Sequence, residues 1–83
     1  MREIAYSKDA AKALERMPRN AADRVRFKIR QYAEDPSSLS ANVKRLKGRP
    51  YYRLRVGDWR VIFDEDRRVV RIIEIGPRGG VYD

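Results

Sequence analysis

Basic side chains concentrate in one stretch in the second half of the chain. Between residues 44 and 60, Asp58 is the one acidic residue. The cations of this stretch are Lys44, Arg45, Lys47, Arg49, Arg53, Arg55 and Arg60. Guanidinium groups donate paired hydrogen bonds to phosphate oxygens, so this composition suits contact with a nucleic acid or stabilisation of a reacting phosphate. The alternative is an exposed face whose charges are solvated or paired with carboxylates such as Glu74.

The spacing of the arginines predicts which of them share a face. Gly57 and Asp58 are a two-residue turn signal between two alternating segments, which indicates a β-hairpin. In that register Arg55 lies directly opposite Arg60, and Arg53 points to the same side because strand side chains alternate. Like charges directly across a strand pair destabilise a sheet. We therefore interpret these three arginines as a phosphate-binding surface.

Two further candidates lie near the C-terminal end. Arg78 stands in a Gly- and Pro-rich segment after the last predicted strand, and Tyr82 follows it closely. A tyrosine beside an arginine cluster can stack on an unpaired base or take part in proton transfer. The alternative for Tyr82 is a frayed terminus or an aromatic ring that closes the edge of the core.

The residue types that are absent narrow the chemistry. The sequence has no His and no Cys, which excludes a thiol nucleophile, a disulfide and a histidine base. The acidic run Asp64, Glu65 and Asp66 predicts a polar hairpin turn rather than a metal site, because no calcium-loop spacing accompanies it. We expect no cofactor and no metal, so any catalysis uses arginine, lysine, tyrosine, carboxylates or groups of the substrate.

Length and charge limit the class of protein. The chain has 83 residues, which suits one domain spanning 1–83. Its net charge is +8, and Arg supplies 15 of its 20 basic residues, so a polyanionic partner is favoured over an uncharged one. No apolar run has the length of a signal peptide or a membrane span, and we expect a cytoplasmic protein that does not enter a membrane.

The elements that would position these residues follow from periodicity and turn signals. A short strand is predicted first, then two helices, the first capped by Ser7 and ended by Pro18, the second capped by Asn20. Alternating β-rich segments follow. The predicted ranges are 3–6, 7–17, 20–33, 51–56, 59–63 and 68–75, with a weaker strand at 42–46. This order predicts an α+β domain with a C-terminal antiparallel meander and both helices packed on one face of the sheet.

Two segments resemble the RelE/ParE superfamily of toxins. One is the run Leu46-Lys47-Gly48 followed by residues 52–63, YRLRVGDWRVIF, and the other is the ending 75–82, IGPRGGVY. The order of elements also fits, so the resemblance covers essentially the whole chain. It implies one of two activities, because RelE-like members cut messenger RNA in the ribosomal A site and ParE-like members inhibit DNA gyrase.

The RelE-like interpretation matches more of this chain's residues. By resemblance, the catalytic positions are Arg53, Arg55, Arg60, Arg78 and Tyr82, with Lys44, Arg45, Lys47 and Arg49 as further RNA contacts. The implied reaction is attack of the RNA's own 2′-hydroxyl on the adjacent phosphorus. The implied partners are a RelB-like antitoxin, the 70S ribosome and messenger RNA, with operator DNA bound only through the antitoxin. The alternatives are a ParE-like gyrase inhibitor and a non-catalytic basic nucleic-acid-binding module.

Overall fold

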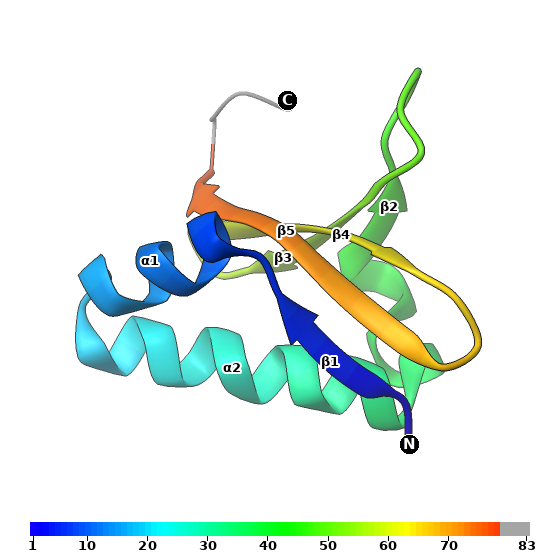
Figure 1. Ribbon diagram of the computed structural model, residues 1–83, viewed down its shortest axis with the longest axis horizontal. Coiled ribbons are helices and arrows are strands. Elements are labelled where there is room, and N and C mark those ends of the chain that lie inside the picture. Colours follow the sequence, from blue (N-terminus) through cyan, green and yellow to red (C-terminus); the bar gives the residue numbers. More distant parts are fainter. Residues whose placement is uncertain (79–83) are drawn as a thin grey trace.

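The computed structural model describes residues 1–78. One sheet carries both helices on a single side, with the long helix running beneath the strands (Figure 1). In chain order the elements are β1 (Glu3–Tyr6), α1 (Lys8–Arg16), α2 (Arg19–Glu34), the 3-10 segment η1 (Pro36–Asn42), β2 (Val43–Arg45), β3 (Tyr52–Val56), β4 (Trp59–Glu65) and β5 (Val69–Pro77). The predicted α+β class and element order are confirmed.

The sheet has five strands in the order β1-β5-β4-β3-β2. Strands β2 to β5 form the predicted antiparallel meander. Strand β1 instead pairs in parallel with β5, with Glu3 opposite Val69, so the sheet is mixed rather than wholly antiparallel. The helices and η1 carry the chain from β1 at one edge of the sheet to β2 at the other edge, and the meander then returns it to β5 beside β1.

The first helix begins as predicted and the second does not. The Ser7 hydroxyl accepts a hydrogen bond from the Ala10 N–H at 3.0 Å, which is the geometry of an N-cap. Helix α2 has Pro18 at its N-cap and no side-chain capping bond. The prediction that Asn20 caps this helix was wrong. Its side chain accepts from the adjacent Ala21 N–H, because the fixed φ of Pro18 has already started the turn.

The core lies between the helices and the inner face of the sheet. Val25 and Ile29 of α2 pack with Leu54, Val61 and Phe63 of the central hairpin. Tyr52 and Trp59, which alternate with arginines along the hairpin, are partly buried against this cluster. The Tyr52 and Phe63 rings stack at 5.6 Å between centroids. The arginines of the same strands must therefore point to the opposite, outer face.

The central hairpin has the predicted register. Gly57 adopts a positive φ of 58° in the turn, a conformation that glycine reaches without strain. Arg55 lies opposite Arg60 across the hairpin. This pairing places the candidate site on rigid strands at the middle of the sheet.

Candidate phosphate-binding site

Four cations lie together on the outer face of the sheet. Arg55 is directly opposite Arg60, and Lys44 of β2 is directly opposite Arg53. We call this set, Lys44, Arg53, Arg55 and Arg60, the arginine face. It contains two like-charge cross-strand pairs on three adjacent strands, where each pair opposes folding. The pairing of Lys44 with Arg53 was not predicted, because the register of β2 has no turn signal of its own.

The arginine face is partly buried. Arg60 is only 4% exposed, while Arg53 and Arg55 are half-buried. The Nε atom of Arg55 is buried and has no hydrogen-bond partner in the described part of the chain. A buried donor without an acceptor costs free energy, and an anionic ligand would remove that cost. This arrangement differs from a layer of freely solvated surface charges.

An apolar residue lies inside the arginine face. Ile62 is 2% exposed but is not part of the main core cluster. Its cross-strand neighbours are Arg53 on β3 and Glu74 on β5. Long polar side chains bury apolar surface with their stems, so these flanking residues shield Ile62 and are held against the sheet by it. These flanking positions were not predicted, although strict alternation from Arg60 places Ile62 on the same face.

The remaining predicted basic residues occupy two different places. Arg45 lies on the other side of β2, with its guanidinium 6.0 Å from the centroid of the Tyr52 ring. Lys47 and Arg49 are exposed in the β2–β3 loop, which projects away from the helices (Figure 1). The Leu46 N–H donates to the Tyr51 carbonyl at 2.9 Å and closes this loop.

The segment after β5 turns back to the central hairpin. The backbone N–H of Arg78 donates to the carbonyl of Asp58 at 2.7 Å, so Arg78 lies beside the β3–β4 turn. Its side chain is exposed. This backbone contact places Arg78, another predicted site residue, at the same end of the hairpin as Arg55 and Arg60. Tyr82, the other predicted residue of this segment, lies outside the described residues.

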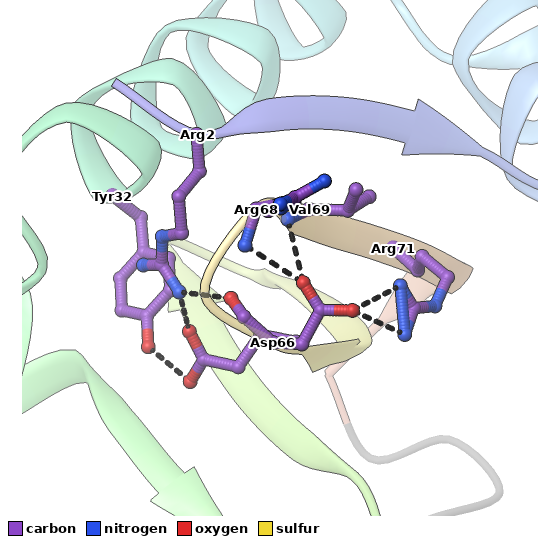
Figure 2. A network of polar contacts seen from close by, with 7 residues as sticks. Arg2, Tyr32, Asp66, Arg68, Val69 and Arg71 are labelled. Atoms are coloured by element: carbon purple, nitrogen blue, oxygen red, sulfur yellow. Dashed lines mark hydrogen bonds and ion pairs between the residues drawn. The ribbon is translucent and has the colours of Figure 1, made fainter.

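The three consecutive acids take part in structural contacts at the far end of the sheet. The Tyr32 hydroxyl donates to Glu65 at 2.7 Å, and Arg2 forms an ion pair with the same carboxylate. Figure 2 shows Asp66 between the backbone N–H groups of Arg68 and Val69 and the side chain of Arg71. Asp64 pairs with Arg71 at 2.9 Å. The predicted polar turn was wrong in its start, because Asp64 and Glu65 pair with Arg71 and Val70 inside β4 and the turn begins at Asp66.

The protonation of this network follows from its contacts. Burial raises the pKa of Tyr32 to about 12, and the hydrogen bond to Glu65 acts in the same direction. Backbone hydrogen bonds from Arg68 and Val69 lower the pKa of Asp66.

Within residues 1–78, no three His, Cys, Asp or Glu side chains are placed to hold a metal ion. No helix in the same range is long and apolar enough to cross a membrane.

The comparisons with known proteins decide the family. A family model described as the ParE toxin of the type II toxin–antitoxin system, parDE, matches residues 4–82. The chain belongs to the RelE/ParE toxin superfamily. The match extends over all the elements described above, so the whole domain, rather than the hairpin motif alone, carries the relationship. No curated protein sequence matches the chain.

Solved structures of superfamily toxins share this fold. The RelE–RelB complex of Pyrococcus horikoshii OT3 matches with a TM-score of 0.79 and 27% identity, covering 96% of this chain and 98% of the other. The intact E. coli RelBE complex matches with a TM-score of 0.74 and 22% identity, covering 96% and 100%. Isolated E. coli RelE matches with a TM-score of 0.76 and 20% identity, covering 98% and 88%. At the identities of the two E. coli matches, the likeness shows the fold alone.

Proposed function

We propose that this toxin is a ribosome-dependent endoribonuclease that cuts messenger RNA in the A site and so inhibits translation. The observation that carries the proposal is the arginine face. Two like-charge pairs and a buried Arg55 Nε that has no hydrogen-bond partner among residues 1–78 oppose folding. They become favourable when a phosphate lies over them, because charge-assisted hydrogen bonds to phosphate are strong. The several solved RelE and YafQ toxins with the same fold support this choice.

In the proposed reaction the RNA supplies its own nucleophile. The 2′-oxygen forms a bond to the adjacent phosphorus, and the bond from phosphorus to the 5′-oxygen of the next nucleotide breaks. The products are a 2′,3′-cyclic phosphate and a free 5′-hydroxyl. The proton lost from the 2′-hydroxyl and the proton gained by the 5′-oxygen must be moved by nearby groups. The reaction requires positioning, charge stabilisation and proton transfer, and needs no group that this chain lacks.

We assign each of these tasks to residues according to their positions in the site. Arg60 and Arg78 would stabilise the charge that develops on the phosphate oxygens, and Arg53 and Arg55 would hold the phosphate. Arginine stays protonated, so it cannot serve as the base, and proton transfer or base stacking is assigned to Tyr82. Further basic residues would contact the RNA backbone on either side. These are Lys44, Arg45, Lys47 and Arg49.

The partners are proposed from the family. Toxins of type II modules are paired with antitoxins, and the matched structures include complexes of RelE with RelB and of YafQ with DinJ. We propose a RelB-like antitoxin for this chain, with an acidic segment that complements the net charge of +8. Operator DNA would be bound through that antitoxin, and the toxin would act in the cytoplasm.

A second candidate function is inhibition of DNA gyrase. The observation that favours it is the family model, whose description names ParE. This activity works by protein contact and does not use a reacting phosphate. It therefore predicts that toxicity survives loss of the arginine-face charges.

The test is translation of a defined message by purified bacterial ribosomes, with the cut sites mapped by primer extension. The wild type is compared with Arg55→Gln and Arg78→Ala, and with Arg30→Gln as a matched control, exposed on α2 near Tyr6 of β1. Circular dichroism verifies that each variant is folded, and naked RNA serves as the substrate control. We expect A-site cuts that need ribosomes, are lost by roughly a hundredfold in the two site variants, and persist in the control.

Other outcomes separate the alternatives. An intact message with folded wild-type toxin overturns the proposal, and inhibition of supercoiling by the same toxin would then establish the gyrase function. Salt-sensitive binding to RNA without any cut, and without effect on gyrase, would establish a non-catalytic binding module.

A further inference from the structure

Gly76 occupies a strand position where the fold does not require glycine. It lies in β5, directly opposite Arg60. Its φ is not positive, unlike those of Gly48 and Gly57 in their turns. A Cβ built on Gly76 would meet no atom of residues 1–78 within 4 Å. Neither backbone conformation nor packing within the described chain therefore accounts for this residue.

Glycine at this position carries a cost. It weakens a strand, because it lacks a side chain for packing and loses more backbone freedom on folding than other residues. The rest of β5 is rich in β-branched residues, including Val69, Val70, Ile72 and Ile75, which suit a strand. A glycine inside a strand often marks a point where a ligand or another backbone approaches closely. Close approach of a bound molecule would explain why a glycine occupies position 76.

The position of Gly76 indicates which molecule that is. It faces outward beside Arg60, between Glu74 on β5 and the segment that carries Arg78. Arg60 is 4% exposed, so a phosphate can reach its guanidinium only by coming close to the sheet. A side chain at position 76 would occupy the space through which it comes. In the part of the chain that the structure describes, the open space over Gly76 and the buried cation beside it thus form one feature.

We propose that Gly76 is the floor of the substrate site, with the ribose-phosphate of the scissile nucleotide in van der Waals contact with its α-carbon. The inference rests on the proposed ribonuclease function and adds a positioning residue to it. Gly76 takes no part in the bond changes. Its role is to let the sugar-phosphate backbone settle deep enough for Arg60 to contact it, with Arg55 and Arg78 at the rim.

The experiment adds size at this one point. Gly76→Ala and Gly76→Val are assayed for ribosome-dependent cleavage over a range of toxin concentrations, which separates the maximal rate from half-saturation. Binding is measured to ribosomes programmed with a message whose scissile 2′-hydroxyl is replaced by hydrogen. Thermal unfolding is followed in parallel. The control is Ala5→Val on exposed edge strand β1, opposite Arg71 and away from the arginine face.

We expect cleavage to fall by about tenfold or more for Ala and by about a hundredfold for Val, because small misplacements at a reacting centre have effects of this size. The midpoint of thermal unfolding should stay unchanged or rise, and any rise should be larger for Val than for Ala. Loss of activity together with equal or greater stability is a signature that a merely structural role would not give. Ala5→Val should match the wild type in both measurements.

The failures are distinguishable. If the wild type cuts the message and both Gly76 variants cut and bind equally well, the inference is overturned and the ribonuclease function stands. Reduced cleavage together with a lower unfolding midpoint also overturns it, since the glycine would then be required by the fold. A wild type that cuts no message overturns the ribonuclease function, and this inference falls with it.

Discussion

At Arg55, the demands of folding and of the proposed site oppose each other. The side chain lies directly opposite Arg60, and its buried Nε lacks a partner in the described chain. Both features lower the stability of the free toxin, yet both favour a bound phosphate. Residues that serve a site at the expense of the fold give opposite changes in stability and activity when they are replaced.

The first prediction tests this opposition with Arg55→Thr. Removing one of two facing cations and adding a β-branched residue should raise the free energy of unfolding by up to about 1 kcal/mol. Cleavage of messenger RNA should fall by roughly a hundredfold. Urea denaturation and the ribosomal cleavage assay measure the two effects.

A matched control lies on the same sheet face. Arg71 pairs with Asp64 and Asp66, so Arg71→Thr removes favourable contacts. It should lower stability slightly, by less than about 1 kcal/mol, and leave cleavage unchanged. If Arg55→Thr instead destabilises the protein as Arg71→Thr does, the opposition at Arg55 does not exist.

The second prediction concerns Tyr32. Its pKa is raised from 10.0 to about 12 in the folded chain, chiefly by burial. The contribution of its protonated form to stability is therefore complete below pH 10 and is lost as the pH rises toward 12. The free energy of unfolding should decline over this range. In Tyr32→Phe, which also loses the bond to Glu65 and about 1 kcal/mol at neutral pH, the decline should be shallower.

This second prediction is checked by denaturant titration at a series of alkaline pH values, with tyrosinate absorbance recorded on the native protein. Tyr6→Phe is the control, because the Tyr6 pKa is also raised by burial but its side chain is 39% exposed. A wild type and a Tyr32→Phe variant with parallel pH dependences would contradict it.

At the scale of elements, one hydroxyl connects a helix to the sheet. Ser7 ends β1, caps α1, and donates its hydroxyl hydrogen to the carbonyl of Ile73 at 2.6 Å. Ile73 lies where the register between β4 and β5 shifts. The same side chain therefore satisfies a helix N-terminus and a carbonyl at an irregular point of the strand.

The third prediction is that Ser7→Ala lowers the free energy of unfolding by about 1 to 2 kcal/mol, because it removes both contacts. Asn20→Ala at the start of α2 should change it by less than about 0.5 kcal/mol, since α2 has no side-chain cap there. Chemical denaturation of both variants makes the comparison. Equal losses in the two variants would show that the link between Ser7 and Ile73 contributes nothing.

Local signals in the sequence predicted the hairpin, but they could not predict how deeply its arginine side chains are buried. Gly57 and Asp58 specify the turn, and the turn specifies that Arg55 faces Arg60. The parallel partner of β1 has no such signal, because Glu3 and Val69 are 66 residues apart and pair only when the whole sheet assembles. The 4% exposure of Arg60 likewise depends on neighbours from other strands. The roles of Arg53, Arg55, Arg60, Arg78 and Tyr82 all stay predictions, and Tyr82 lies outside the described residues.

At the scale of the whole molecule, charge is placed on both sides of the sheet. The arginine face and the β2–β3 loop lie away from the helices, while other cations, such as Lys12 of α1, lie on the helical side. A polyanion held on the arginine face should respond to the first set of charges and not to the second. The net charge of +8 alone would not distinguish them.

The fourth prediction compares Lys47→Gln in the projecting loop with Lys12→Gln on α1. Both reduce the net charge by one. Binding to a short 2′-O-methylated RNA should weaken for Lys47→Gln, and its log–log dependence on salt should become shallower by about 0.7, the value for one lost contact with a single strand. Lys12→Gln should leave the slope unchanged. Equal slopes in the two variants would show that binding follows total charge rather than the proposed face.

Because β1 pairs in parallel with β5, the sheet of the toxin cannot be completed until late in the synthesis of the chain. At about 5 to 20 residues per second, roughly 3 to 13 seconds separate the emergence of β1 from that of its partner. During this interval β1 has no strand beside it, and β4 lacks its neighbour on that side. A chain without β5 lacks the core side chains Val70, Ile72 and Ile75, and it also lacks Gly76 and Arg78 of the candidate site. A chain terminated before β5 therefore cannot assemble the site, so a broken copy of the toxin's own message would encode no partly active product.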